Sequence, residues 1–375
     1  MSMAASADGS RSGLTRRHAL GLGLGLVGGA SLSGKVRASA ALSDLQLAGQ
    51  RVIGSYPGLT PPQSLFTDIS NGRVAGVIFF GENISSTSQI AGVVAQLRQA
   101  QAQSPVQVPL LLMTDQEGGT VRRLPGAPTL SEKQVGQSAD PVAAATSAGT
   151  GAGQNLAGVG MNVNLAPVLD VYYKSGNFID QYGRSYSNNP AVVTECGRAF
   201  VTAQQQTGVA ATAKHFPGLG SATRSQNTDS GPVTLNVTLS KLRSFDEAPY
   251  PAAIGAGVKL VMVSWAIYPA LDAGRPAGLS PTIVGNELRG RNGFTGVTIT
   301  DAIEAGALSA FGTTGQRAVS AAGAGMDLIL CSARDVAQGE AATSALASAL
   351  TGGQLDRATF TAAVDRVTTL RAGLT

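Results

Sequence analysis

Residues 41–375 repeat one pattern, in which a short run of β-branched and other apolar residues is followed by a longer segment rich in alanine. This alternation is typical of repeated βα units, in which helices cover a sheet of parallel strands. Eight such runs follow one another, at residues 50–56, 74–81, 109–117, 162–171, 209–216, 260–268, 297–301 and 326–331. Eight units in a segment of this length predict an α/β fold built as a single TIM-type (β/α)8 barrel.

An open, doubly wound sheet is the alternative for such a pattern. That fold usually carries a glycine-rich phosphate-binding motif after its first strand, and neither G-x-G-x-x-G nor a P-loop follows residues 50–56. No proline- or serine-rich linker divides residues 41–375, which favours one domain. Residues 334–372 are predicted to form two closing helices separated by Gly352 and Gly353.

The first forty residues have a different character. A basic twin-arginine run at residues 10–20 leads into a short apolar stretch at residues 19–32, and Ala38-Ser39-Ala40 follows. These features predict a twin-arginine export signal at residues 1–40, and hence an extracellular or cell-envelope location for residues 41–375. An uncleaved anchor is the alternative. The apolar stretch is short and glycine-rich for a membrane span, so no stable membrane insertion is expected after the signal is removed.

The net charge and the small number of histidines and cysteines limit which partners and cofactors can be expected. Of 27 basic and 23 acidic residues, five basic and one acidic lie in residues 1–40, so 22 of each remain and no nucleic-acid partner is predicted. His215 is the single histidine after residue 40, so no metal and no cofactor are predicted. Cys196 and Cys331 are expected to be buried thiols, with a disulfide as the alternative. The sequence carries no signature of a particular oligomeric state.

Polar residues gather where four of the predicted strands end. They are Asp115-Gln116-Glu117-Gly118-Gly119, Asp170, Lys214-His215-Phe216-Pro217-Gly218 and Asp301. In a barrel the carboxyl ends of the strands surround one mouth, so we expect these side chains to lie together. Helix capping alone does not explain four clusters or a Lys-His pair. Carboxylates and cations around one mouth suit a neutral ligand rich in hydroxyl groups and predict the cleavage of glycosides.

Six longer motifs extend this reading. LLMTDQEGGTVRRL (111–124), GMNVNLAPVLDV (160–171), KHFPGLG (214–220), YPALDAGRPAGLS (268–280), GFTGVTITDA (293–302) and AGAGMDLILCS (322–332) follow one another along the chain. Together they resemble glycoside hydrolase family 3, specifically its compact bacterial β-N-acetylhexosaminidases. Because the motifs keep the family's order over nearly all of residues 41–375, the resemblance does not depend on any one of them.

The resemblance implies roles for individual residues. Asp301, in ITDA, would be the nucleophile that attacks the anomeric carbon and forms a covalent glycosyl-enzyme. Five residues would hold the terminal sugar: Asp115, Arg123, Arg184, Lys214 and His215. Two of these also have a purely structural reading, Arg184 as a loop ion pair and His215 as a buried, hydrogen-bonded histidine.

The sequence departs from the family at the acid/base. Compact members carry a second histidine in KHFPGHG, and an Asp-Ser-His on the next loop whose Asp and His act together. Here Leu219 takes the first position, and the loop reads Thr228-Asp229-Ser230-Gly231. Asp229 is therefore predicted to act alone, with a pKa raised by a dry loop. Glu304 is a second candidate, although a charge in the first turn of a helix explains it more simply.

The predicted activity is that of a retaining exo-β-N-acetylhexosaminidase with a carbohydrate substrate. It would release terminal N-acetylglucosamine from cell-wall-derived or chitin-derived glycosides. The missing histidine leaves open a sugar-binding or weakly active protein on a degenerate hydrolase barrel. A β-glucosidase is the other alternative, but family members with that activity usually carry a further C-terminal domain.

Overall fold

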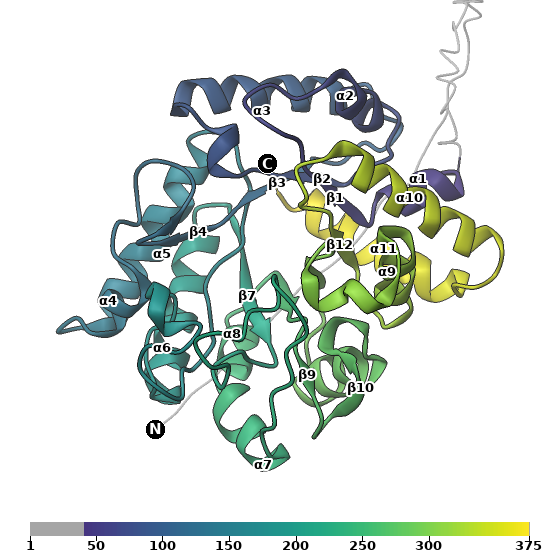
Figure 1. The fold of residues 1–375 in the computed structure, drawn as a ribbon. Helices are drawn as coiled ribbons and strands as arrows, with labels where there is room; N and C mark the ends of the chain where they lie inside the picture. The colour runs from purple at the N-terminus through teal and green to yellow at the C-terminus, as the bar shows by residue number, and fades with distance from the viewer. Residues whose placement is uncertain (1–40, 375) are drawn as a thin grey trace, which may run out of the picture. The chain divides into compact units, whose positions relative to one another are not determined.

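The computed structural model describes residues 41–374, and the predicted export signal lies outside this range. Eight parallel strands close a barrel in the order β1-β12-β11-β8-β7-β6-β3-β2 (Figure 1). The barrel strands are β1 (Val52–Gly54), β2 (Gly76–Ile78), β3 (Leu111–Thr114), β6 (Val163–Asn164), β7 (Ala210–Phe216), β8 (Leu260–Val263), β11 (Val297–Ala302) and β12 (Leu328–Leu330). Each predicted run overlaps one of these strands, so the (β/α)8 barrel is confirmed.

Side chains of the barrel strands alternate between the barrel interior and the surrounding helices. In β8, Leu260 and Met262 belong to the interior cluster, whereas Val261 and Val263 pack between the strands and the helices. The alternation arises because successive side chains of a strand point to opposite faces. All four residues are buried, and a strand buried on both faces reads as a continuous apolar run.

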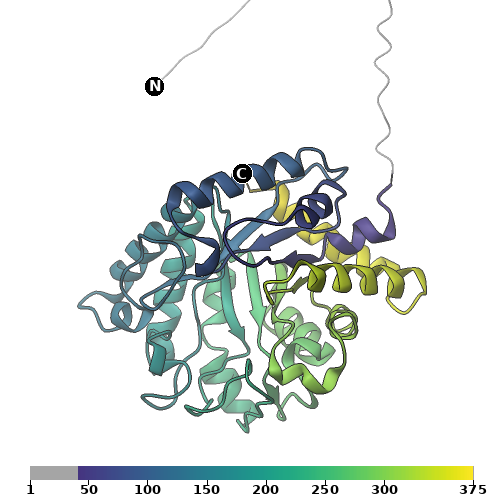
Figure 2. The ribbon, with the colours of Figure 1, turned by 45° about the horizontal axis from the view of Figure 1, so that its top comes forward.

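Helices surround the barrel, as the two views in Figures 1 and 2 show. They are α1 (Asp44–Gly49), α2 (Gln63–Ser70), α3 (Thr87–Gln101), α4 (Glu132–Gly136), α5 (Pro141–Ala157), α6 (Pro190–Gln205), α7 (Leu239–Lys241), α8 (Tyr250–Gly255), α9 (Thr314–Gly323), α10 (Val336–Thr351) and α11 (Arg357–Ala372). The side chains of Asp140 and Asn189 cap α5 and α6, and a proline follows each cap. Proline is tolerated there because the first N–H groups of a helix have no acceptor within the helix.

Shorter elements connect the main ones. The 3-10 turns are η1 (Gly81–Asn83), η2 (Asp180–Tyr182), η4 (Ala277–Leu279) and η6 (Gly306–Phe311), and the π turns are η3 (Leu242–Asp246) and η5 (Thr282–Arg291). Two hairpins lie outside the barrel, β4 (Gln116–Gly118) with β5 (Val121–Arg122), and β9 (Ile267–Tyr268) with β10 (Asp272–Pro276). The predicted runs 109–117 and 260–268 therefore extend past the barrel strands β3 and β8 into β4 and β9.

The end of the described chain matches its prediction. Helices α10 and α11 are separated by a turn with Gly352 and Gly353, and Gly353 has a φ of 74°, which favours glycine. Cys196 and Cys331 are both buried free thiols, as expected. Among residues 41–374, no helix has the length and apolar character needed to cross a membrane.

Candidate active site

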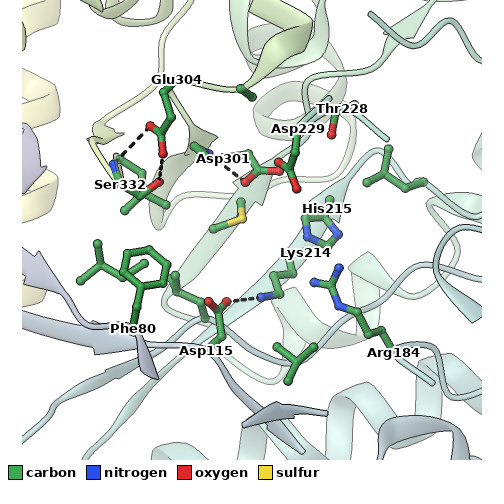
Figure 3. A pocket seen from close by; sticks show the side chains of 18 of the residues that line it. Phe80, Asp115, Arg184, Lys214, His215, Thr228, Asp229, Asp301, Glu304 and Ser332 are labelled. Atoms are coloured by element: carbon green, nitrogen blue, oxygen red, sulfur yellow. Dashed lines mark hydrogen bonds and ion pairs between the residues drawn. The ribbon is translucent and has the colours of Figure 1, made fainter. Parts of the chain in front are cut away.

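A cavity of about 370 Å³ lies at the carboxyl ends of the barrel strands (Figure 3). It is lined by all seven residues singled out from the sequence: Asp115, Arg123, Arg184, Lys214, His215, Asp229 and Asp301. Glu304 and Arg334 also line it, so four carboxylates face four Lys or Arg side chains. This balance suits a neutral ligand better than a phosphate, which calls for a surplus of basic groups.

Lys214 lies at the centre of a buried ion-pair network. Its Nζ is 2.8 Å from Asp115 Oδ1 and 2.7 Å from Glu117 Oε1. Arg184 donates two hydrogen bonds to Glu117, of 2.9 and 2.8 Å. Burial opposes ionisation of Glu117, but Arg184 and Lys214 outweigh it and hold the pKa of Glu117 at about 2. Burial likewise opposes the charge on Lys214, yet Asp115 and Glu117 raise the pKa of Lys214 above its ordinary value.

Glu117 is a site residue to which the sequence analysis gave no role. It is 2% exposed and does not line the cavity, but it holds both Lys214 and Arg184 at the cavity wall. The available signal was its spacing from Asp115. Residues two apart in an extended segment point to the same side, which brings both carboxylates to Lys214.

Glu117→Ala should strongly destabilise the fold, because it leaves two buried cations without their shared carboxylate. Breaking a buried pair in this way typically costs about 3–5 kcal/mol of unfolding free energy. Denaturant unfolding monitored by circular dichroism measures the loss. Glu195→Ala is the matched control, since Glu195 pairs with Arg198 on the surface and such pairs contribute about 1 kcal/mol or less. Equal losses for the two variants would show that the network is not needed for stability.

His215 is held from behind by Asp170. Its Nδ1 lies 2.7 Å from Asp170 Oδ2, and the backbone N–H of Leu219 donates to Asp170 Oδ1 at 2.6 Å. A carboxylate at Nδ1 favours the tautomer with its proton on that nitrogen, which leaves Nε2 for other partners. Asp170 is fully buried and does not line the cavity. The prediction that its side chain lies with the others around the mouth was therefore wrong. The carboxylate of Asp170 is therefore engaged by His215 on β7 and by Leu219 in the loop that follows.

Irregular strand ends bring neighbouring residues into the same cavity. The pairing of β7 with β8 shifts between Ala213 and Phe216, and the pairing of β11 with β12 shifts between Ile299 and Ala302. In a regular strand two successive side chains would point to opposite faces. Such irregularities re-aim side chains next to active sites. As a result Lys214 and His215 both line the cavity, and so do Asp301 and Ala302.

Trp265 supports the strand end that carries Asp301. Its indole Nε1–H donates a hydrogen bond of 2.8 Å to the carbonyl of Ala302, and the side chain is completely buried. A buried indole N–H needs such an acceptor. No motif in the sequence indicated this role, although Trp265 is the only tryptophan of the chain.

The glycine pair after Asp115 forms the turn between β4 and β5. Gly118 and Gly119 have φ values of 118° and 55°, which other residues rarely adopt. The hairpin returns the chain to Arg123, whose Nε lies 4.0 Å from Asp115 Oδ2 and has no hydrogen-bond partner among the described residues. Arg123 lines the cavity and its side chain is 36% exposed, so its guanidinium can reach a ligand there.

The loop that carries Asp229 is docked on the loop that follows Asp301. Gly306 N–H donates to the carbonyl of Asp229, and Ala307 N–H donates to that of Thr228, each at 2.9 Å. The contact requires glycine, because a Cβ at position 306 would lie 2.6 Å from the Ser230 backbone. Figure 3 shows the carboxylates of Asp229 and Asp301 pointing toward one another.

Asp229 has a perturbed carboxyl group. Burial, and then the negative charge of Asp301, raise the pKa of Asp229 to about 6, although His215 and Arg184 act in the opposite direction. Part of the Asp229 surface nevertheless remains open to solvent at the cavity. A carboxyl group with this pKa exists in both protonation states near neutral pH.

Leu219 and Gly231 stand where compact family members carry histidines, and the two positions differ in their surroundings. Leu219 is 3% exposed and lines the cavity. Gly231 lies beside Asp229, and a Cβ at that position would meet no atom within 4 Å. The chain thus has open space where a histidine side chain would begin.

Glu304 does not start a helix, so the simpler reading of it was wrong. It lies in the turn after β11, before η6 (Gly306–Phe311). Its carboxylate accepts hydrogen bonds from Ser332 Oγ at 2.6 Å and from Gln338 Nε2 at 3.0 Å. In Figure 3 it points toward Ser332. These contacts tie the loop after β11 to the loop after β12, and they occupy the oxygens that an acid would need.

Comparison with known proteins identifies the family. The model of the glycosyl hydrolase family 3 N terminal domain matches residues 45–370. The chain belongs to glycosyl hydrolase family 3. It is therefore a glycoside hydrolase, as predicted, and its eight-stranded barrel is that of family 3.

Among residues 41–374, no three or more His, Cys, Asp or Glu side chains are grouped so that they could hold a metal ion.

Two relatives are similar over most of this chain. An uncharacterized secreted glycosyl hydrolase of Arthroderma benhamiae is 48% identical over 90% of this chain and 96% of its own length. Beta-hexosaminidase A of Pseudoalteromonas piscicida is 31% identical over 84% of this chain, which spans only 56% of that longer relative.

Two solved structures share the fold. The β-N-acetylglucosaminidase of a Paenibacillus species has a TM-score of 0.83 and 34% identity, over 89% of this chain and 63% of that chain. The β-N-acetylhexosaminidase of Beutenbergia cavernae has a TM-score of 0.79 and 32% identity, over 88% of this chain and 99% of that chain.

Proposed function

We propose that the chain is a retaining exo-β-N-acetylhexosaminidase in which Asp301 is the nucleophile and Asp229 the acid/base. One observation carries the proposal: the two carboxylates point toward one another in the cavity (Figure 3), and the pKa of Asp229 is raised to about 6. Retaining glycosidases need such a pair, with one protonated carboxyl and one ionised carboxylate about 5 to 5.5 Å apart. Environments that favour different protonation states provide the two roles.

The reaction would proceed in two steps. Protonated Asp229 donates its proton to the glycosidic oxygen while Asp301 attacks the anomeric carbon, which gives a covalent glycosyl-enzyme and the free leaving group. Asp229, now a carboxylate, takes a proton from water as the water attacks the same carbon. The bond to Asp301 breaks, and the sugar is released with its original β configuration.

The terminal sugar would be held by the cavity wall opposite this pair. Asp115 can accept hydrogen bonds from sugar hydroxyls, while Arg123, Arg184 and Lys214 can donate to them. His215 would contribute Nε2, because Asp170 engages its Nδ1. The name of the Paenibacillus β-N-acetylglucosaminidase supports N-acetylglucosamine as that sugar, and the Pseudoalteromonas and Beutenbergia names support a hexosaminidase. The proposed sources of the sugar are cell-wall-derived or chitin-derived glycosides.

The proposed place of action is outside the cytoplasmic membrane, as an extracellular or cell-envelope enzyme. Residues 1–40 would form a twin-arginine export signal, and residues 41–375 the family 3 barrel domain. The secreted Arthroderma relative supports an exported protein.

Two substrates and one stereochemical measurement test the function. The protein should hydrolyse 4-nitrophenyl β-N-acetylglucosaminide at least tenfold more efficiently than the corresponding glucoside, and proton NMR should detect the β-anomer first. An α-anomer as first product would exclude the two-step mechanism. Preference for the glucoside would support a β-glucosidase. Binding of N-acetylglucosamine without turnover would support a sugar-binding protein, the alternative raised by Leu219 and Gly231.

A further inference from the structure

Arg334 and Phe80 form a second group of residues that line the cavity, and Phe80 lies beside Asp115 (Figure 3). Arg334 places its guanidinium 4.2 Å from the centre of the Phe80 ring, and its Nε lies 3.3 Å from Glu82 Oε1. Phe80 and Arg334 both line the same cavity as Asp301. Both contacts of Arg334 are with the loop after β2, so it stands apart from the network around Lys214.

The backbone of Arg334 is strained. Its φ is 61°, and it is the only described residue other than glycine with a positive φ. This conformation costs free energy in a residue with a side chain, so it persists only where its surroundings enforce it. Here the Arg334 N–H donates a 2.9 Å hydrogen bond to Ser55 Oγ, after β1. Strain of this kind is concentrated at functional sites.

The loop that carries Phe80 is fixed by a buried asparagine. Asn83, fully buried, accepts a 2.7 Å hydrogen bond from the Phe80 N–H through Oδ1. Its Nδ2 donates to the carbonyls of Tyr56 and Gly58 at 3.1 and 2.6 Å. The ring and the guanidinium are therefore held in place before any ligand binds, which lowers the entropic cost of binding.

The order of strands around the barrel indicates which part of a substrate Arg334 and Phe80 would contact. Asp115 and Lys214, in the proposed sugar-binding wall, follow β3 and end β7, and Asp301 lies on β11. The next strands around the barrel are β12, β1 and β2, and their loops carry Arg334, Ser55 and Phe80. We take the terminal sugar to lie against the ends of β3 and β7, with its anomeric carbon at Asp301 on β11. The leaving group then extends toward the loops after β12, β1 and β2.

We propose that Arg334 and Phe80 form a subsite for the leaving group, and that this group is a second, uncharged sugar unit. The inference rests on the proposed function. The Nη groups of Arg334 have no partner among residues 41–374, and its side chain is 47% exposed, so they can donate to sugar hydroxyls or to an acetamido carbonyl. Phe80 adds an apolar ring surface. Glu82 already offsets the charge of Arg334, so an acidic leaving group would gain little and would meet a carboxylate.

Binding without turnover tests the subsite. In an Asp301→Asn background, calorimetry compares N,N′-diacetylchitobiose with N-acetylglucosamine. Arg334→Ala should weaken disaccharide binding roughly tenfold, the effect expected when hydrogen bonds from a charged group are lost, and leave monosaccharide binding within about twofold. Arg334→Gly should do the same, and because glycine adopts this φ freely it excludes misfolding as the cause.

The matched control is Arg198→Ala, on the outer face of α6. Its side chain is 45% exposed and pairs with Glu195, much as Arg334 pairs with Glu82, so it should change neither affinity. An unchanged disaccharide affinity in the Arg334 variants, an equal loss for both sugars, or no binding of either sugar would overturn the subsite. Failure of wild-type hydrolysis would count against the proposed function alone, because this measurement needs no turnover.

Discussion

Asp301→Asn should lower the hydrolysis of 4-nitrophenyl β-N-acetylglucosaminide on the order of a thousandfold or more. An amide cannot form the covalent glycosyl-enzyme, and enzymes that lose their nucleophile typically lose activity on this scale. The fold should persist, because an asparagine Oδ1 can still accept the 2.8 Å hydrogen bond that the Ala302 N–H donates to Asp301. Steady-state kinetics and thermal unfolding of the same preparation separate the two effects.

Asp365→Asn is the control for this substitution. Asp365 is an exposed residue of α11 that lines a separate cavity with Lys259 and Gly296, which immediately precede the barrel strands β8 and β11. Its replacement should leave turnover unchanged. Azide should partly restore activity to Asp301→Gly and give an α-linked glycosyl azide, because it can enter from the side of the missing carboxylate. Wild-type rates in Asp301→Asn, or a β-linked azide, would remove Asp301 from the nucleophile role.

Asp229→Ala should slow the cleavage of N,N′-diacetylchitobiose by a factor of roughly a hundred to ten thousand, the usual contribution of a general acid. The 4-nitrophenyl glycoside should lose far less in the bond-breaking step, because nitrophenolate leaves without a proton. In the wild type, kcat/KM for the disaccharide should fall as the pH rises through about 6, since Asp229 must be protonated to donate. The variant should lack this pH dependence. Equal losses for both substrates, or none, would exclude Asp229 as the acid.

Gly306→Ala tests whether the position of the same carboxylate matters. The new Cβ would lie 2.6 Å from the Ser230 backbone, so the Asp229 loop must shift. Small displacements of a catalytic group can cost about a hundredfold in rate. We therefore expect a smaller version of the Asp229→Ala pattern, with a lower kcat for the disaccharide and a nearly unchanged KM. A change confined to KM would instead place the effect on sugar binding.

The barrel and the composition of its cavity were accessible from sequence because both depend on local patterns. A strand such as β8 is apolar on both faces, so it appears as a continuous run whatever surrounds it. The carboxyl ends of parallel strands then converge at one mouth, which is why Asp115, Lys214 and Asp301 could be grouped without knowledge of any contact. The absence of a histidine at Leu219 and Gly231 is likewise a fact of the sequence.

Only the tertiary structure decided which groups pair with each other. Asp170 and Glu304 both follow barrel strands, yet the first is buried behind His215 and the second ties two loops together. The roles of Glu117 and Arg334 depend on partners from segments distant in the chain. Hydrogen bonds and ion pairs act over a few ångströms, whereas the spacing of residues along the chain reports only on the local backbone. The sequence by itself therefore determined the fold and the residues at its mouth, and three-dimensional packing determined their partners, orientations and protonation.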